Sequence, residues 1–174
     1  MTHEDVDTAV IGGGQAGLAV GYYLRQRGRP FVILVEHPRI GDAWRDRWDS
    51  LRLFTPGRYN GLPGVPFPGP PSSYLGKDDL ADYLNAYARH FEFPIRTGVR
   101  VDTLSKAGDR FLLAARGSLI SAANVIVATG AYHTPRLPTF AGGLDQRIVQ
   151  LHSATYRRPS QIQAGGVLVV GAGN

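Results

Sequence analysis

The sequence contains no cysteine, although it is 174 residues long. This absence excludes a disulfide framework, a thiolate metal site and a redox-active cysteine pair. Long hydrophobic runs are also missing, and apolar stretches such as residues 167–170 are far too short to cross a bilayer. The start of the chain is polar and acidic, so it lacks the basic and apolar zones of a signal peptide. We therefore expect a cytoplasmic protein without a membrane partner.

Runs of basic residues are missing as well, despite a net charge of +5. Of the 19 basic residues 17 are arginines, which are scattered singly or in pairs, whereas nucleic-acid-binding proteins gather positive charge in a patch or arm. The histidines at 3, 37, 90 and 133 are isolated and show no metal-ligand spacing. The composition is ordinary for a soluble globular protein. We expect neither a nucleic-acid partner nor a metal site.

The amino-terminal part predicts a strand, a glycine-rich turn and a helix. Residues 6–11 are rich in β-branched side chains, as in a buried parallel strand, and the pattern Gly12-x-Gly14-x-x-Gly17 follows without a gap. Residues 31–35 form the second strand, which completes one right-handed βαβ unit. Apolar side chains recur between the strands at helical spacing, at Ala16, Ala19, Val20, Tyr23 and Leu24.

The glycine pattern indicates a specific chemistry. The first glycine allows a tight turn, the second lets the backbone approach a pyrophosphate, and the third lets helix and strand pack closely. The amino end of the helix offers free N–H groups and the positive end of its dipole to phosphates. Glu36 lies 19 residues after Gly17, where an acidic residue binds ribose hydroxyls. A glycine-rich turn without a ligand and a merely solvated Glu36 are the alternatives.

The middle of the chain predicts a long loop, a helix and a meander. Residues 38–76 are rich in Pro, Gly and aromatic side chains, which indicates an ordered excursion that covers a ligand. An apolar stripe predicts an amphipathic helix over residues 77–91. Short strands follow at 100–104, 110–115 and 119–122, and a buried strand at 124–129 is expected beside the first strand.

Near the end of the chain the glycine signature recurs. Residues 167–170 are typical of another buried strand, and Gly171 and Gly173 follow it directly. This predicts the opening of a second dinucleotide-binding unit, with a glycine-rich tail as the alternative. We therefore expect one domain over residues 1–161, a truncated second one over 162–174, and a longer two-nucleotide protein. A missing partner leaves an apolar sheet edge, so a homo-oligomer or an absent carboxyl-terminal half is the expected partner.

Several motifs together resemble the amino-terminal part of the class B flavin-dependent monooxygenases, which include flavin-containing and YUCCA-like enzymes. The matching segments span the chain in the family's order and are residues 11–18, 39–45, 48–53, 128–130 with Pro135 and Pro138, 152–156, and 169–174. The resemblance implies an α/β fold: a Rossmann-like FAD-binding domain whose parallel sheet carries a three-stranded antiparallel meander, followed by the start of a second Rossmann-like domain.

The same resemblance implies roles for individual residues. Gly12, Gly14, Gln15, Ala16 and Gly17 would hold the FAD pyrophosphate, and Glu36 the FAD ribose. The flavin side of FAD would lie along Gly41, Trp44 and Arg45, and the backbone of Val101, in the first meander strand, would meet the adenine. The cofactor would be closed over by Ala128, Thr129 and Gly130. An incomplete NADPH site would include His152, Gly171 and Gly173.

The sequence also departs from the family. Val35 stands where relatives carry the acidic residue, and Glu36 comes one position later, so either the second strand ends early or ribose binding is weakened. Gln146 and Ile148 replace residues of the family's fingerprint before His152. Tyr156 stands where Baeyer–Villiger members carry Trp, which argues against ketone oxygenation. The alternative for His152 is a hydrogen-bonded structural residue between two domains.

The resemblance implies an NADPH-dependent flavoprotein monooxygenase that oxygenates a small-molecule substrate through a flavin peroxide. No catalytic carboxylate pair or triad is required, because the cofactor carries the chemistry. Two alternatives stay open. One is an FAD-dependent reductase or dehydrogenase that never oxygenates, and the other is an inert FAD-binding fragment.

Overall fold

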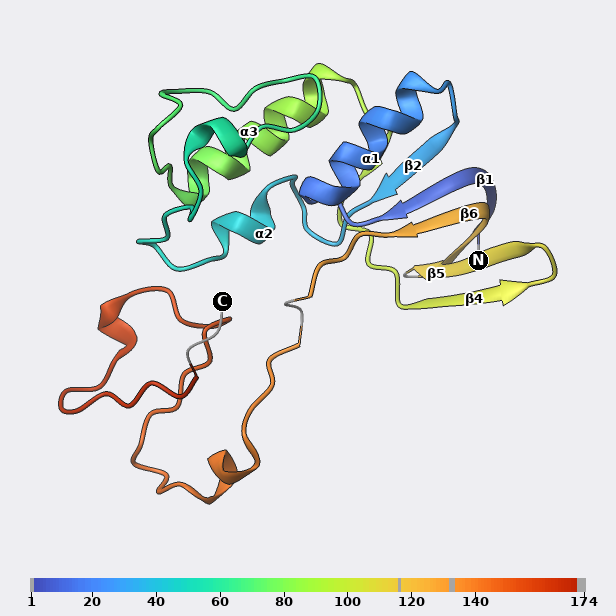
Figure 1. The fold of residues 1–174 in the computed structure, drawn as a ribbon. Helices are drawn as coiled ribbons and strands as arrows, with labels where there is room; N and C mark the ends of the chain where they lie inside the picture. Colours follow the sequence, from blue (N-terminus) through green and yellow to red (C-terminus); the bar gives the residue numbers. More distant parts are fainter. Residues whose placement is uncertain (1, 116, 132–133, 172–174) are drawn as a thin grey trace.

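The computed structural model of the chain describes residues 2–115, 117–131 and 134–171, and its strands form one six-stranded sheet in the order β3-β2-β1-β6-β5-β4 (Figure 1). The parallel strands are β1 (Thr2–Ile11), β2 (Phe31–Leu34), β3 (Ile95–Arg96) and β6 (Ser118–Val127). β4 (Thr103–Ala107) and β5 (Arg110–Ala115) extend the sheet from β6 as an antiparallel meander. This arrangement confirms the predicted α/β fold with a parallel sheet and a meander.

Strands β1 and β2 contribute side chains to a core on each face of the sheet, because successive side chains along a strand point to opposite faces. Val10 of β1 and Ile33 of β2 belong to the core shared with helices α1 (Gln15–Gln26) and α3 (Lys77–His90). Their neighbours Ala9, Val32 and Leu34 belong to a second core, shared with the meander. Figure 1 shows both helices on one side of the sheet.

Helix α1 covers the predicted range, and Val20 and Leu24 of its predicted apolar face pack against the core, but the rest of that face is only partly correct. Gly17, Leu18 and Gly21 are buried, whereas Ala16 and Tyr23 are exposed. A Cβ added at Gly21 would lie 3.1 Å from the side-chain end of Ile33, so helix and sheet approach closely through glycine. A hydrophobicity pattern does not mark glycine as a buried residue, which explains the error.

Helix α3 confirms the prediction for residues 77–91. The excursion of residues 38–76 is ordered as predicted and is hydrogen-bonded to this helix. The Tyr83 hydroxyl accepts a hydrogen bond from the Leu62 N–H (2.6 Å) and donates one to the Val65 carbonyl (2.7 Å). Two short helices, α2 (Asp42–Arg45) and η1 (Gly57–Tyr59), lie within the excursion. Whether the excursion also covers a ligand stays a prediction.

The strands predicted at 119–122 and 124–129 are one continuous strand, so the predicted break is wrong. β6 pairs with β1 along its whole length, from Ser118 opposite Thr2 to Val127 opposite Ile11. A polar residue, Asn124, interrupts the apolar run without interrupting the backbone ladder. The first meander strand also begins later than predicted, at Thr103.

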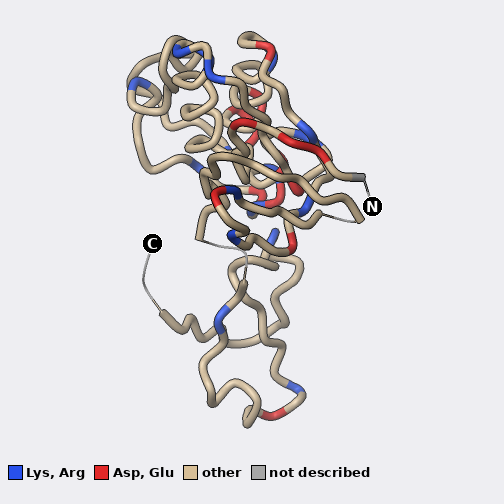
Figure 2. Tube along the Cα trace, turned by 90° about the vertical axis from the view of Figure 1, so that its right-hand side faces the viewer, with Lys and Arg blue, Asp and Glu red and all other residues tan. Residues whose placement is uncertain are grey.

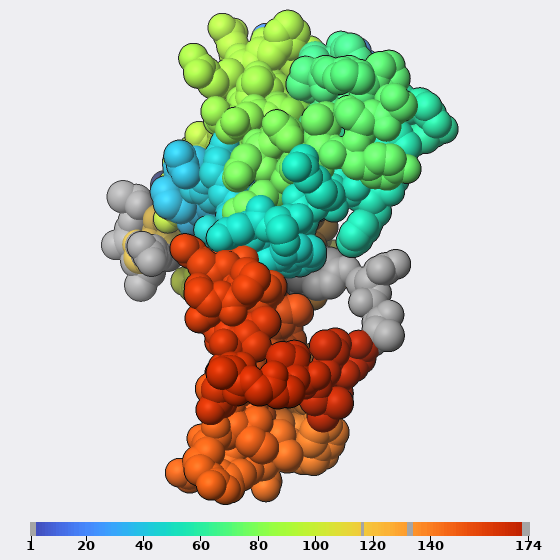
Figure 3. All heavy atoms as spheres, turned by 90° about the vertical axis from the view of Figure 1, so that its left-hand side faces the viewer, coloured from blue at the N-terminus to red at the C-terminus, as the bar shows by residue number. Residues whose placement is uncertain are grey.

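Residues 134–171 run away from the sheet and contain two short helices, η2 (Thr139–Gly143) and η3 (Pro159–Gln161) (Figures 1 and 3). The Asp49 N–H donates to the Arg157 carbonyl (2.8 Å), which ties this segment to the excursion. The predicted strand at 167–170 is wrong, since these residues are irregular and exposed. Within the described ranges no neighbouring strand completes their backbone hydrogen bonds, which a strand requires.

Acidic and basic residues follow one another closely along the part of the chain that forms the sheet (Figure 2). Arg29 pairs with Asp7 (3.5 Å) and Arg110 with Asp5 (3.2 Å). Solvent and salt screen such exposed pairs, so they add little to stability. None of the helices in the part of the chain that the structure describes is long and apolar enough to span a bilayer.

Candidate functional site

Three parallel strands end at the same edge of the sheet, and the predicted site residues follow them. Ile11, the last residue of β1, lies opposite Leu34 of β2 and Val127 of β6. The Gly12 N–H donates to the Leu34 carbonyl (2.8 Å), and the Ala128 N–H donates to the Ile11 carbonyl (2.8 Å). The glycine loop, the Glu36 segment and residues 128–130 therefore meet at this edge of the sheet. We call it the ligand edge, because open α/β sheets bind their ligands at such a place.

The first and third glycines of the loop are required by packing. Gly12 has a φ of 110°, and a Cβ added to it would lie 2.4 Å from the Ala128 carbonyl oxygen. A Cβ on Gly17 would lie 1.9 Å from the Gly12 carbonyl oxygen. Backbone lies on both sides of each contact, so a side chain at either position would push the loop away from β6 or α1.

Gly14 has the opposite environment. It is the N-cap of α1 with a φ of −82°, which any residue adopts, and no described atom lies within 4 Å of a Cβ built on it. It offers no side chain to the N–H groups of the first turn, which an α-helix leaves without intrahelical partners. Gln15 and Ala16 beside it are exposed. The site therefore presents open space and free donors where a pyrophosphate would fit.

Gly13, which the sequence motif leaves unspecified, also has a packing role. A Cβ on it would lie 2.6 Å from Val35 Cγ2 and 2.7 Å from Ile40 Cδ1. Both side chains are buried beneath the loop. The signal for this contact in the sequence is the apolar residue in place of an acidic one at position 35.

Strand β2 ends at Leu34, one residue earlier than predicted, and this end decides where Glu36 lies. Val35 is buried, whereas Glu36 is exposed at the ligand edge. An Arg100 guanidinium nitrogen donates to Glu36 Oε1 (3.2 Å). Of the two alternatives for the offset acidic residue, the early strand end is therefore the one observed.

Val101 lies beside this edge but not in a meander strand, so that part of the prediction is wrong. It precedes β4, is half-buried and packs against the meander core. The Val99 N–H donates to the Val35 carbonyl (2.8 Å), and the Gly98 N–H donates to the His37 carbonyl (2.9 Å). These bonds run the segment before Val101 alongside the end of β2.

Gly41 and Arg45 are engaged in packing between α2 and α3. Gly41 has a φ of 90°, and a Cβ on it would lie 2.5 Å from the Ala81 carbonyl oxygen. The Arg45 guanidinium donates to the Ile40 carbonyl (3.1 Å), to Asp42 Oδ1 (3.2 Å) and to Asp82 across the interface. Both residues thus brace the loop that leads from the ligand edge.

Around these residues a carboxylate and a lysine are buried. Burial raises the pKa of Asp42, but hydrogen bonds from Arg39 and Arg45 outweigh burial and hold its pKa below the usual range. Lys77 is 9% exposed, and its Nζ donates to the carbonyls of Arg45 (2.5 Å) and Arg47 (3.1 Å). Trp44, on α2, is half-buried against the helical core. Sequence patterns gave no sign of the Lys77 contact, because a lysine at a helix start is usually solvated.

After β6 the chain passes the glycine loop and leaves the sheet. Ala128 is half-buried against the core, while Thr129 and Gly130 are exposed, and Gly130 has a φ of 76°. The three residues lie at the ligand edge as predicted. The role of closing over a ligand stays a prediction.

The structure gives His152 contacts within its own turn. Its Nδ1 accepts a hydrogen bond from the Ala154 N–H (3.0 Å), and its carbonyl accepts bonds from the Thr155 (2.8 Å) and Tyr156 (3.0 Å) N–H groups. These contacts are all local, so a role of His152 in an NADPH site or between two domains stays a prediction. Gly171 is exposed with a φ of 101°, and Gly173 lies outside the described residues.

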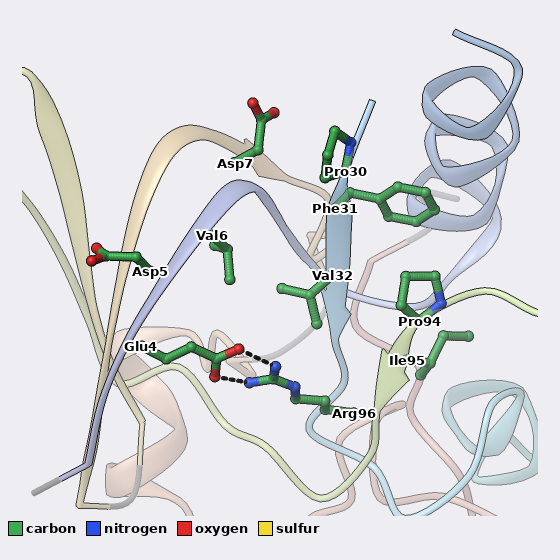
Figure 4. Close-up of a pocket in the computed structure, with 10 residues that line it drawn as sticks. All are labelled: Glu4, Asp5, Val6, Asp7, Pro30, Phe31, Val32, Pro94, Ile95 and Arg96. Carbon is green, nitrogen blue, oxygen red and sulfur yellow. Dashed lines mark hydrogen bonds and ion pairs between the residues drawn. The ribbon is translucent and has the colours of Figure 1, made fainter. Parts of the chain in front are cut away.

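A separate cavity of about 390 Å³ lies at the opposite end of β2, between the first half of β1 and β3 (Figure 4). Arg96 donates two hydrogen bonds to the Glu4 carboxylate there and holds the pKa of Glu4 below its usual range. Pro30 and Phe31 line the cavity where β2 begins. It is therefore not part of the ligand edge. Among the described residues no cluster of three His, Asp or Glu side chains could hold a metal ion.

Comparison with known proteins agrees with the geometry. A family model described as pyridine nucleotide-disulphide oxidoreductase matches residues 9–174. An uncharacterized CzcO-like oxidoreductase of Geobacillus kaustophilus is 47% identical over 97% of this chain and 49% of its own length. The indole-3-pyruvate monooxygenase YUCCA1 of Oryza sativa is 34% identical over 95% of this chain and 42% of its own length.

Among solved structures, a flavin-containing monooxygenase from Stenotrophomonas maltophilia superposes with a TM-score of 0.84. It is 37% identical, and the match covers 90% of this chain and 48% of that one. The chain thus spans about half the length of the curated relatives it matches.

Proposed function

Because the chain belongs to the pyridine nucleotide-disulphide oxidoreductase family and is flavin monooxygenase-like, we propose that it binds FAD at the edge formed by β1, β2 and β6. Residues 1–161 are the FAD-binding domain of a flavoprotein monooxygenase that uses NADPH and oxygenates a small molecule. The flavin supplies the redox and oxygen chemistry when bound.

The observation that carries this proposal is the clear space at Gly14. A glycine that neither packing nor φ requires stands at the N-cap of a 12-residue helix, where three strands end. A diphosphate needs close backbone approach at such a point. In this function Gly12, Gly17 and Ala128 shape the loop, and the first-turn N–H groups of α1 bind the pyrophosphate.

The remaining cofactor contacts follow from position. Glu36 accepts hydrogen bonds from the adenosine ribose, and the backbone near Val101 borders the adenine. Trp44 borders the flavin half, on a loop that Gly41 and Arg45 brace. Thr129 and Gly130 close over the cofactor.

The NADPH part of the proposal concerns residues 162–174. We infer that Gly171 and Gly173 open a second dinucleotide-binding unit and that residues 167–170 become its first strand when neighbouring strands complete its ladder. The exposure of Val167, Leu168, Val169 and Val170, between 59% and 87%, supports this, because four such apolar side chains favour a covered position. His152 supports the turn between the two units.

Binding of FAD to purified Gly14→Ala tests the cofactor proposal. The added methyl group meets no described protein atom but stands where the pyrophosphate approaches. We expect FAD affinity to fall by tenfold or more, with little change in the melting temperature of the apoprotein. Gly142→Ala is the matched control, because its Cβ is also free of contacts and lies in the remote η2. Wild-type affinity in Gly14→Ala would exclude this FAD site.

A second candidate is an FAD-dependent reductase that does not oxygenate. The disulphide-reductase name of the family model favours it, while the absence of cysteine in this chain argues against its thiol-dependent branch. Reaction of the whole protein with NADPH, ¹⁸O₂ and a thioether separates the two. Transfer of ¹⁸O to sulfur identifies the monooxygenase, and NADPH oxidation without transfer identifies the reductase. NADPH oxidation by the 174-residue chain alone would exclude an inert fragment.

A further inference from the structure

Arg100 lies at the ligand edge, and neither the glycine motif nor the family resemblance gives it a role. We propose that Arg100 is a positioning residue that holds the Glu36 carboxylate toward the adenosine ribose. This role rests on the proposed FAD function and adds one residue to that site. The chemical group that Glu36 and Arg100 recognise together is the ribose diol of an adenine nucleotide.

Backbone pairing fixes Arg100 beside Glu36. The Gly98 and Val99 N–H groups donate to the His37 (2.9 Å) and Val35 (2.8 Å) carbonyls, so the two segments run side by side beyond the end of β2. Arg100 then reaches Glu36 Oε1 at 3.2 Å. The contact therefore follows from the main-chain register and does not depend on a chance meeting of two long side chains.

The guanidinium is also held from its other side. Arg100 Nε lies 3.4 Å from Asp102 Oδ1, and the Asp102 N–H donates to the Ala114 carbonyl of β5 (2.8 Å). Arg100 is thus bound between one carboxylate anchored on the meander and another at the ligand edge. Only Oε1 of Glu36 is used, and none of the described residues donates a hydrogen bond to Oε2.

A glutamate that is 46% exposed has many rotamers, and fixing one of them opposes ligand binding. An arginine already bound to one oxygen reduces that loss and leaves the other oxygen for a ribose hydroxyl. A residue that positions the carboxylate matters more here, because Glu36 follows the buried Val35 and lies beyond the end of β2. A surface ion pair with no ligand role has the same geometry, so the test must separate the two.

The test measures binding of ADP and of 2′,3′-dideoxy-ADP to the complete 174-residue chain. We expect Arg100→Ala to weaken ADP binding about threefold to tenfold and to leave dideoxy-ADP binding unchanged, because that ligand offers Glu36 no hydroxyl. Arg100→Lys should restore part of the loss. In a Glu36→Ala background the Arg100→Ala change should have no further effect on ADP, since the two residues act through one contact.

The control is Arg29→Ala, which removes an exposed pair with Asp7 (3.5 Å) near the amino end of β2. It should leave the affinity for both nucleotides unchanged. Unchanged ADP affinity in Arg100→Ala overturns the positioning role. So does an equal loss for ADP and dideoxy-ADP, or a full additional loss in the Glu36→Ala background. If wild type binds neither FAD nor ADP, the proposed function fails and the role of Arg100 fails with it.

Discussion

Replacing Gly17 by alanine tests whether the glycine loop is set by backbone packing. The added Cβ would lie 1.9 Å from the Gly12 carbonyl oxygen, while real Cβ atoms essentially never come closer than 3.0 Å to another heavy atom. Helix α1 and the loop would therefore have to separate by at least 1.1 Å. Neither side can yield by a rotamer change, because the contact is with main chain.

The expected loss follows from two opposing effects. Overpacking of this kind costs about 1–3 kcal/mol and more when only backbone can move. Alanine in a helix recovers up to about 1 kcal/mol relative to glycine. We expect the free energy of unfolding of the apoprotein to fall by about 2 kcal/mol, a large share of the roughly 5–15 kcal/mol that holds a domain folded. For a chain of this size the melting temperature would fall by about 5 °C.

Urea unfolding of the apoprotein, followed by tryptophan fluorescence, measures this loss without any ligand. Gly21→Ala is the matched control on the same helix. Its Cβ would lie 3.1 Å from the mobile end of the Ile33 side chain, so it should be neutral or slightly stabilising. If Gly17→Ala is as stable as Gly21→Ala, the close contact between helix and loop is not present in the folded protein.

Three further changes test the packing around the site. Lys77→Met should lower the free energy of unfolding by about 2 kcal/mol in urea unfolding, because two partly buried carbonyls lose a charged donor, whereas Lys106→Met, at an exposed position, should have little effect. The folded pKa of Asp42 lies below its unfolded value, so its stabilisation is present above about pH 4 and is lost as the pH falls through the lowered pKa. Asp42→Asn should reduce the loss of stability at acid pH that calorimetry measures, and an unaltered loss would contradict the assignment. Tyr87→Phe should cost about 1 kcal/mol in thermal unfolding, because its hydroxyl donates to the Pro63 carbonyl (2.7 Å).

Much of the fold could be predicted from local patterns. The first βα unit and helix α3 follow from apolar periodicity and from turn residues, which act within a few positions of the sequence. Their end points differ by one residue at the end of β2, which is Leu34 in place of Val35, and by four at the start of β1, which is Thr2 in place of Val6. These features are predictable because their causes are local.

The errors arise where the cause is distant in sequence. β6 is continuous through Asn124 because β1 supplies a ladder along its whole length. The apolar run at 167–170 is irregular because the described residues supply no such partner. A sequence pattern shows that a segment can be a strand, and only the neighbouring chain decides whether it becomes one.

Single residues of the site also differ in whether a local pattern or a distant contact explains them. Gly41 was expected beside the flavin, yet its φ of 90° and its approach to the Ala81 carbonyl already require glycine. Gly12 and Gly17 are likewise fixed by backbone contacts, so a protein that had lost its ligand would still keep them. Gly14 differs, since nothing in the described fold requires it. The motif alone cannot separate these cases, because all are glycine. The structure distinguishes the glycines that packing requires from Gly14. Ligand binding can therefore be tested independently of folding at Gly14, Glu36 and Arg100.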